Sequence, residues 1–308
     1  MLVGVDLGGT KIEAVLVSED GDELRTHQRK RVPTNAAEGY DAVVARTVEL
    51  VRAVVRAEGL RVLPPVGIGL PGGISRQTGL VKNANTVCLN GRPFRADVAA
   101  ALGVRVAFEN DANCLVLAET LLGGAKAYRG GVVFGVILGT GVGGGWMLSG
   151  GLHGGPNGVA GEWGHHTLRE GGRACYCGRS GCVEAYLSGP ALTASYFERT
   201  GGAATAPQII ALAEGGDEAG SEVFAAYLED FGRALGNVVN IVDPDAIVLG
   251  GGLSRASELY TRGRAAIARH TFNDELLTPV LSAALGDSAG VYGAALLVRA
   301  AGLSTRKP

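Results

Sequence analysis

The chain has 308 residues, of which 46% are hydrophobic and 19% charged, and its basic and acidic side chains nearly cancel to a net charge of −2. This composition excludes a wholly disordered chain, and the charge balance removes the general attraction that would hold the molecule on nucleic acid or an anionic membrane. Glycine is the outlier, with 50 residues against an ordinary share of about 7%, so we expect many tight turns or close backbone approaches.

The length fits two lobes, at roughly 100–200 residues per domain. Asp6 interrupts the N-terminal apolar run where a signal peptide would need an unbroken one, so we do not expect secretion. The stretch Gly130–Gly161 carries no charge, but 14 of its 32 residues are glycines, which divide it into pieces too short to span a membrane. We therefore expect a cytoplasmic protein that binds neither membrane nor nucleic acid.

Strands and helices are predicted to alternate in the first half of the chain. Short β-rich runs flank a glycine-containing segment at residues 6–11, and a turn at Asp20-Gly21 leads to a more exposed strand. Valines at helical spacing then predict a helix that stops at Gly59. The expected strands are Leu2–Val5, Ile12–Val17, Glu23–Arg31, Val66–Leu70 and Val104–Phe108, and the expected helices are Glu38–Glu58, Phe94–Leu102 and Asp111–Leu122.

The same order starts again after Gly123-Gly124, with a strand, a glycine loop and a second strand. Each half of the chain thus opens with a β-hairpin around a glycine-rich tip. Two α/β lobes with a cleft between them are the simplest prediction from this repeat. The expected elements of the second half are strands Val132–Leu138, Trp146–Leu148 and Ala246–Leu249 and a helix at Glu222–Val242.

The glycine loop at Gly139–Gly144 has the spacing G-x-G-x-x-G after a strand, and Glu162 lies 18 residues beyond it. This comes close to the dinucleotide-binding fingerprint of dehydrogenases. That fingerprint requires a helix to begin inside the loop, whereas here a strand and a turn follow. The context therefore excludes the dehydrogenase interpretation, and the chain contains no G-x-x-x-x-G-K-[ST] segment for P-loop chemistry.

A hairpin tip rich in glycine and threonine can present backbone N–H groups and a hydroxyl to phosphate oxygens. Asp6–Lys11 forms a second such tip, with a carboxylate suited to holding Mg²⁺, often through water. One glycine loop alone is as easily a plain tight hairpin. Two of them, with Gly250–Gly252 following a strand, favour a phosphate-binding function.

Three of the five cysteines, Cys175, Cys177 and Cys182, fall within eight residues and follow a histidine. The spacing H-x9-C-x-C-x4-C, read from His165, supplies one nitrogen and three sulfur ligands, which suits a closed, structural zinc site. His166 is adjacent and could take the place of His165. The thioredoxin-like alternative fails, because the spacing is C-x-C and not C-x-x-C.

Asp111 follows a predicted strand and opens a predicted helix, which would hold its carboxylate on rigid structure as a general base requires. The competing interpretation is a helix N-cap, for which Asn and Asp are favoured on stability grounds alone. From position alone the cap is the stronger of the two. Polar residues suited to binding a polyol lie at Asn83–Asn85, after Pro71, and at Glu162, His165 and Glu184.

Together these features resemble the ROK family of bacterial sugar kinases and regulators, within the sugar kinase, actin and Hsp70 superfamily. The resemblance covers almost the whole chain, from Gly4 to the helix at residues 293–295. It implies an α/β, two-lobed actin-like ATPase fold with an inter-lobe cleft, and a homodimer. The small lobe would be residues 1–118, joined by a C-terminal helix at about 290–308, and the large lobe would be residues 119–289 with the zinc-binding loop.

The resemblance also assigns roles to residues. The segment N-D-A-N at 110–113 matches the family's catalytic segment, in which Asp111 takes the proton from the sugar hydroxyl, and the G-E-x-G-H pattern selects His165 over His166 as a zinc ligand. ATP and Mg²⁺ would lie between the glycine loops. The implied cofactor-binding residues are Asp6, Gly8, Gly9, Thr10, Lys11, Gly139, Thr140, Gly141, Gly143, Gly250, Gly251 and Gly252; the sugar-binding residues are Gly72, Asn85, Asn110, Asp111, Glu162, His165 and Glu184; the zinc ligands are His165, Cys175, Cys177 and Cys182.

The implied activity is an ATP-dependent hexose kinase that phosphorylates a 6-hydroxyl. The segments Lys82–Thr86, Leu89–Gly91 and Gly161–His165 are most similar to the fructokinase/mannokinase branch, so fructose is the expected substrate. The alternatives are a glucokinase or a kinase of N-acetylglucosamine or N-acetylmannosamine. A sugar-sensing regulator is a third possibility, but family regulators carry a DNA-binding segment ahead of the first phosphate loop, and Asp6 is only six residues in.

Overall fold

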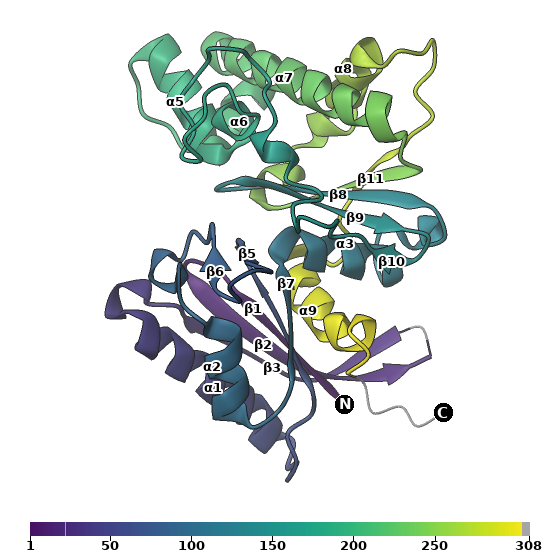
Figure 1. The fold of residues 1–308 in the computed structure, drawn as a ribbon. Helices are drawn as coiled ribbons and strands as arrows, with labels where there is room; N and C mark the ends of the chain where they lie inside the picture. The colour runs from purple at the N-terminus through teal and green to yellow at the C-terminus, as the bar shows by residue number, and fades with distance from the viewer. Residues whose placement is uncertain (22, 304–308) are drawn as a thin grey trace.

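The computed structural model describes residues 1–21 and 23–303 and contains two five-stranded mixed sheets and a two-stranded hairpin. The first sheet has the order β3-β2-β1-β4-β7, and the second the order β10-β9-β8-β11-β12 (Figure 1). The first sheet comprises β1 (Leu2–Leu7), β2 (Lys11–Asp20), β3 (Glu23–Pro33), β4 (Val66–Leu70) and β7 (Val106–Asn110), and the second β8 (Val132–Leu138), β9 (Val142–Leu148), β10 (Gly151–Leu152), β11 (Ala246–Gly250) and β12 (Val280–Ser282).

The two sheets repeat one topology. In each, the first three strands form an antiparallel meander. A fourth strand then pairs in parallel with the opening strand, and a fifth pairs in parallel with the fourth. The carboxyl ends of the parallel strands therefore share one edge of their sheet, where α/β proteins commonly bind ligands. The two predicted hairpins and the duplicated order are confirmed.

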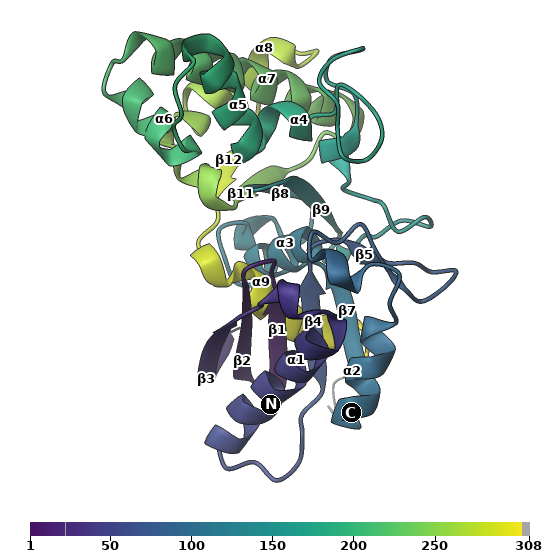
Figure 2. The same ribbon diagram turned by 90° about the vertical axis from the view of Figure 1, so that its left-hand side faces the viewer.

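Helices cover both sheets. Helices α1 (Tyr40–Ala57) and α2 (Phe94–Leu102) pack on one face of the first sheet and α9 (Ala289–Ala300) on the other, and together they form the first lobe (Figure 2). The second sheet carries five helices on its outer side, which complete the second lobe (Figure 1). These are α4 (Glu184–Leu187), α5 (Gly189–Thr200), α6 (Ala206–Glu214), α7 (Glu218–Val242) and α8 (Arg262–His270).

Helix α3 (Asp111–Leu121) packs on β8 and β9 of the second sheet and also on α9, so the helices α3 and α9 lie between the two sheets. Their contact is made at the backbone: a Cβ atom at Gly293 would lie 1.8 Å from the carbonyl oxygen of Cys114. A Cβ atom at Gly67 would lie equally close, 1.8 Å, to the carbonyl oxygen of Ala294 in α9. Part of the glycine excess thus serves close packing. The predicted lobe boundary at residue 118 falls inside α3 and stays a prediction.

The structure departs from the predicted elements in two ways. Strand β9 begins at Val142 and not at Trp146, because its glycines are strand residues packed against neighbours. A Cβ atom at Gly144 would lie 2.7 Å from Trp163, and one at Gly145 would lie 2.5 Å from the Asn113 side chain. The composition of this segment indicated a loop, but tertiary contacts require those glycines. The hairpin of β5 (Gly73–Ile74) and β6 (Val81–Lys82), strand β12 and helices α4, α5, α6 and α8 were not predicted.

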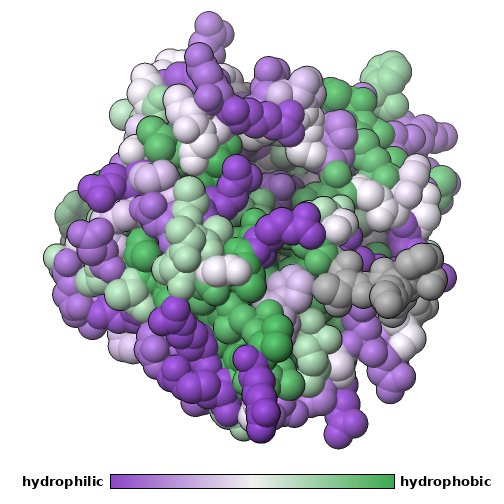
Figure 3. Space-filling model, turned by 60° about the horizontal axis from the view of Figure 1, so that its bottom comes forward, coloured by the Kyte–Doolittle hydropathy of each residue, from purple (hydrophilic) through white to green (hydrophobic). Residues whose placement is uncertain are grey.

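The surface of the first lobe, viewed from its outer end, is mixed in character. Hydrophobic residues form a connected area that hydrophilic side chains border (Figure 3). Within the described residues, no helix combines the length and apolar character needed to cross a membrane. The C-terminal helix predicted at about 290–308 is α9, which ends at Ala300, and residues 304–308 of the predicted range lie outside the described part of the chain.

Candidate active site

The predicted site residues follow the strand ends at which the two lobes meet. Asp111 follows β7, and a Cβ atom at Gly143 on β9 would lie 3.4 Å from the Cβ of Ala112. In the first lobe, a Cβ atom at Gly9 would lie 3.6 Å from the Asn85 side chain. The fold therefore brings the first hairpin tip beside a predicted sugar residue and the start of α3 beside the second glycine segment.

Asp111 is the first residue of α3, and its neighbour Asn110 is the N-cap. The Asn110 side-chain oxygen accepts the Ala112 N–H at 2.8 Å, while its amide donates to the Gly72 carbonyl at 3.0 Å. The capping role in the competing interpretation of Asp111 therefore belongs to Asn110. In the Asp111 carboxylate, Oδ1 accepts the Ala112 N–H at 2.9 Å, so a ligand would be bound through the other oxygen, Oδ2.

The Asp111 carboxyl is in the electrostatic state that a base needs. Burial raises its pKa to about 6, opposed by the Ala112 N–H and reinforced by the negative charge of Glu162. A carboxylate with a pKa near 6 is ionised at neutral pH yet is a stronger base than an exposed aspartate.

The first hairpin tip is held closed by its own backbone. The Gly8 N–H donates to the Lys11 carbonyl at 2.9 Å. Thr34, the residue after β3, donates its N–H to the Thr10 carbonyl and its hydroxyl to the Gly8 carbonyl. Gly9 and Thr10 are exposed at the apex. This geometry offers a rigid polar tip of the kind that binds phosphate oxygens.

Asp6 lies at the base of this tip, against the backbone of α9, where a Cβ atom at Gly290 would be 3.0 Å from its carboxylate. Burial, and after it the negative charges of Asp111 and Glu13, raises the pKa of Asp6 to about 7, while the positive charge of Lys11 opposes this shift. Among the described residues Asp6 forms no ion pair, and a divalent cation would stabilise such a buried carboxylate. The donor set thus fits the predicted Mg²⁺ function.

We expect Asp6→Asn to stabilise the protein without ligands at pH 8 and to do so much less at pH 5. The pKa of Asp6 is higher in the folded chain than in the unfolded chain, so the folded state binds more protons between pH 4 and pH 7 and stability falls as pH rises. Above pH 7 the ionised Asp6 lowers the free energy of unfolding by at most roughly 4 kcal/mol, and the partial solvent access of the side chain reduces this cost. Thermal melts of wild type and variant at both pH values test this. A gain in melting temperature that is equal at both pH values, or equal to that of Asp20→Asn at the exposed end of strand β2, would contradict this expectation.

The second tip is tied to the predicted sugar residues. The Val142 N–H donates to the Glu184 carboxylate at 2.8 Å, the Gly189 N–H donates to the Gly139 carbonyl at 2.7 Å, and the Trp163 indole N–H donates to the Gly143 carbonyl at 2.8 Å. The Thr140 side of the turn is exposed. One set of bonds therefore positions both the second glycine tip and the segments that carry Glu162 and Glu184.

The third glycine segment divides into two parts. Gly250 is the buried last residue of β11, where a Cβ atom would collide with Leu115, so its lack of a side chain serves packing. Gly251 has φ +86° and lies over the Leu138 carbonyl, a conformation and a spacing that favour glycine. Gly252 has open space around its Cα, and these last two residues are the ones a nucleotide could approach.

Asn85 is exposed, and its segment is fastened by Asn90, whose role the sequence did not reveal. The Asn90 side chain accepts the Ala84 N–H and donates to the Ala84 carbonyl, both at 2.9 Å. Gly72 has φ +104°, and a Cβ atom there would lie 2.7 Å from the Lys82 carbonyl, which explains why a glycine stands beside this segment.

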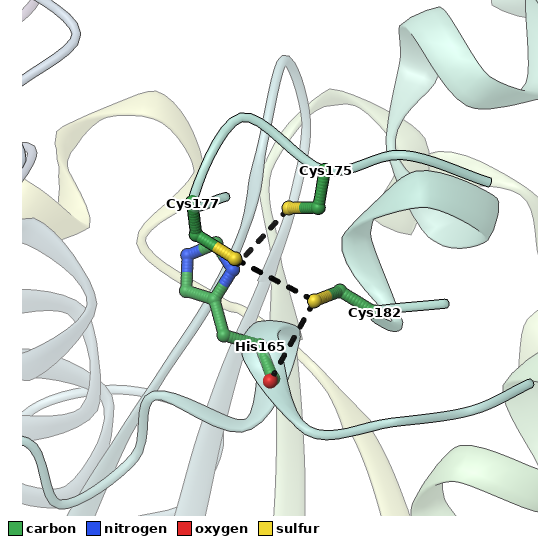
Figure 4. A group of neighbouring side chains, drawn as sticks. All are labelled: His165, Cys175, Cys177 and Cys182. Atoms are coloured by element: carbon green, nitrogen blue, oxygen red, sulfur yellow. Dashed lines mark hydrogen bonds between the residues drawn. The ribbon is translucent and has the colours of Figure 1, made fainter. Parts of the chain in front are cut away.

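His165, Cys175, Cys177 and Cys182 converge, as Figure 4 shows, and one ligand atom from each lies within 4.8 Å of all the others. The Cys177 and Cys182 sulfurs are 3.6 Å apart, and the Cys175 sulfur is 3.7 Å from His165 Nδ1. A tetrahedral zinc ion with bonds of about 2.0–2.3 Å separates its ligand atoms by roughly 3.5–3.8 Å. The four residues thus have the spacing and chemistry of a structural zinc site.

The two adjacent histidines are distinguished by this geometry. His165 turns Nδ1 to the sulfurs, whereas the Nδ1 of His166 hydrogen-bonds the Trp163 carbonyl at 2.7 Å. His165 also contacts Tyr176, whose hydroxyl is 3.1 Å from Nε2.

The ROK family model matches residues 2–301. The chain belongs to the ROK family. Among ROK relatives, an N-acetyl-D-glucosamine kinase of Escherichia coli O1:K1 / APEC is 38% identical over 307 residues, covering 96% of this chain and 99% of that protein. The structure of a ROK hexokinase from Thermus thermophilus has a TM-score of 0.84 at 33% identity, covering 96% of this chain and 97% of that one. A ROK family glucokinase from Streptomyces griseus, solved with glucose and AMPPNP, has a TM-score of 0.81 at 30% identity, covering 97% and 99%.

ROK membership confirms the family resemblance and the two-lobed, actin-like ATPase fold. The roles assigned to single residues stay predictions. The charge of Glu162 acts on Asp111, and the charges of His165 and Glu162 act on Glu184, so these residues are electrostatic neighbours. Glu119, which the sequence did not single out, is fully buried, and its carboxylate accepts three backbone N–H groups at 2.8–2.9 Å. The donors are Gly124, Ala284 and Leu285, so Glu119 fastens the end of α3 to the segment that leads into α9.

Proposed function

We propose that this ROK protein is an ATP-dependent kinase that phosphorylates the 6-hydroxyl of N-acetylglucosamine. The observation that carries the proposal is the position of Asp111 as the first residue of α3, a helix that Asn110 caps, with a pKa near 6. Its neighbour Ala112 lies against Gly143 of the second tip, and the charge of Asp111 acts on Asp6 at the base of the first tip. Phosphoryl transfer requires chiefly positioning and charge stabilisation, together with a group that accepts the hydroxyl proton.

Each part of the site has one task in this reaction. Asp111 Oδ2 orients the sugar hydroxyl and takes its proton, while the tips at Gly8–Lys11 and Gly139–Gly143 hold the phosphates of ATP through backbone N–H groups. Asp6 would hold Mg²⁺, which neutralises the charge of the phosphates when bound. The zinc ion would take no part in the phosphoryl transfer. It would shape the sugar site by joining the His165 segment to the one that leads into Glu184.

N-acetylglucosamine replaces fructose as the favoured sugar. The fructose expectation rested on short segments, whereas the 38% identical relative extends over nearly the whole chain and is named for N-acetylglucosamine. The alternative already considered from the sequence therefore has the better support. Glucose is the second candidate, because the Streptomyces griseus relative was solved with glucose.

A coupled assay of five sugars with MgATP tests the proposal: N-acetylglucosamine, glucose, mannose, N-acetylmannosamine and fructose. We expect kcat/KM to be highest for N-acetylglucosamine and lower for glucose, by a factor of roughly ten or more, since a site built around a substituent discriminates against sugars that lack it. A higher kcat/KM for fructose would reject the sugar assignment and leave the kinase assignment intact. Sugar binding without any phosphorylation would favour the regulator instead.

The remaining expectations from the resemblance, a homodimer, a cytoplasmic location and a resident zinc ion, stay part of the proposal. The zinc claim is supported by the four converging ligands.

A further inference from the structure

Tyr176 stands at a position that the sequence did not mark as functional. It lies between Cys175 and Cys177, so the predicted zinc site holds its backbone on both sides. The side chain is 72% exposed, and its ring meets the His165 ring edge-on, with centroids 5.3 Å apart and an interplanar angle of 79°. An exposed tyrosine held this rigidly can act as a recognition surface.

The Tyr176 hydroxyl contacts Nε2 of His165, the ring nitrogen that does not face the cysteine sulfurs. His165 directs Nδ1 to the cysteine sulfurs, so a metal on Nδ1 leaves the ring proton on Nε2. In this structure the partner of Nε2 is the Tyr176 hydroxyl, at 3.1 Å. A sugar oxygen that binds His165 must therefore replace the phenol as the acceptor of this N–H.

The geometry of a pyranose determines which substituent arrives there. The charge of Glu162 acts on Asp111, and the charges of His165 and Glu162 act on Glu184. A sugar with its 6-hydroxyl at Asp111 would therefore extend toward Glu162, His165 and Glu184. In the ring, C2 lies directly opposite C5, the carbon that bears C6. The substituent on C2 is thus far from the transferred phosphate, and in this orientation it would face His165 and its neighbour Tyr176.

We propose that Tyr176 is a specificity-determining residue that reads the substituent on C2 of the sugar, an inference that rests on the kinase function proposed above. The carbonyl oxygen of an acetamido group accepts the His165 Nε2–H in place of the Tyr176 hydroxyl, and the acetyl methyl packs on the ring of Tyr176. A plain hydroxyl at C2 replaces the hydrogen bond but leaves the ring without an apolar partner.

The test compares two sugars that differ only at C2. In Tyr176→Ala, kcat/KM for N-acetylglucosamine relative to that for glucose should fall about tenfold, the lower end of what one apolar contact gives in discrimination. In Tyr176→Phe, which retains the ring, this ratio should stay within roughly twofold of wild type, because the displaced hydroxyl contributes to neither complex. Phe272→Ala, at a 98% exposed residue after α8, is the matched control and should leave kcat/KM for both sugars unchanged.

Calorimetric affinities for both sugars without ATP, and the zinc content of each variant, provide readouts that are independent of turnover. An unchanged ratio in Tyr176→Ala, or an equal loss for both sugars together with loss of zinc, would overturn the inference and assign Tyr176 to support of the loop. The proposed kinase function fails separately, if wild type phosphorylates neither sugar.

Discussion

Asp111→Asn is expected to lower kcat by at least about 10²-fold, within the 10²–10⁴-fold that a general base contributes. The amide keeps the size of the side chain but cannot take the proton from the sugar hydroxyl. Folding should be retained, because Asn110 and not Asp111 provides the cap of α3. Steady-state kinetics with N-acetylglucosamine and MgATP, with calorimetric sugar affinity, measure both effects.

The matched control is Asp41→Asn, which removes an exposed carboxylate from the first turn of another helix, α1. It should leave kcat unchanged. In wild type, kcat/KM should fall as the pH drops below about 6, since burial raises the Asp111 pKa to that value and only the ionised form accepts a proton. Retention of more than about a tenth of wild-type kcat in Asp111→Asn would be incompatible with a general base.

Cys177→Ser is expected to abolish the binding of one zinc ion per chain and to lower the melting temperature sharply. Zinc binding in structural sites contributes about 10–16 kcal/mol in small zinc-finger peptides, and a serine oxygen replaces a thiolate poorly as a ligand. Because the proposed ion would join the His165 segment to the one preceding Glu184, sugar affinity should fall as well. Metal analysis, thermal melts and calorimetry measure these three quantities.

Cys88→Ser is the control for this change, because Cys88 lies in the first lobe, outside the cluster, and the variant should retain zinc. Absence of zinc from wild type purified without chelators would refute the site. Zinc loss with unchanged sugar affinity would refute only its connection to the sugar residues.

Regular spacing made much of the architecture predictable. The two hairpins with glycine tips, the strand before Asp111 and the cysteine cluster each follow from short local patterns, because a turn, a strand or a metal knuckle is specified by residues close in sequence. The distinctions between adjacent residues were not accessible in this way. Whether Asn110 or Asp111 caps α3, and whether His165 or His166 faces the sulfurs, depends on where distant segments lie.

Long-range contacts explain the features that the sequence did not reveal. The glycines of β9 were interpreted as a loop because the neighbours that exclude their side chains, such as Asn113 and Trp163, come from elsewhere in the chain. The role of Glu119 was missed for the same reason, because its hydrogen-bond partners Ala284 and Leu285 are more than 160 residues away in the sequence. A helix interior is an ordinary place for a glutamate, so no local signal marked it.

The backbone contact between α3 and α9 has a mechanical consequence. Gly293 packs against the backbone of Cys114, and Glu119 is hydrogen-bonded to the segment before α9, so this contact opposes sliding of the two helices past each other. We therefore expect a relative movement of the lobes to be a rotation about this contact. Asp111 lies in α3, three residues before Cys114, so a small rotation would move its carboxylate little. Segments of the second lobe farther from the contact would be displaced more by the same angle.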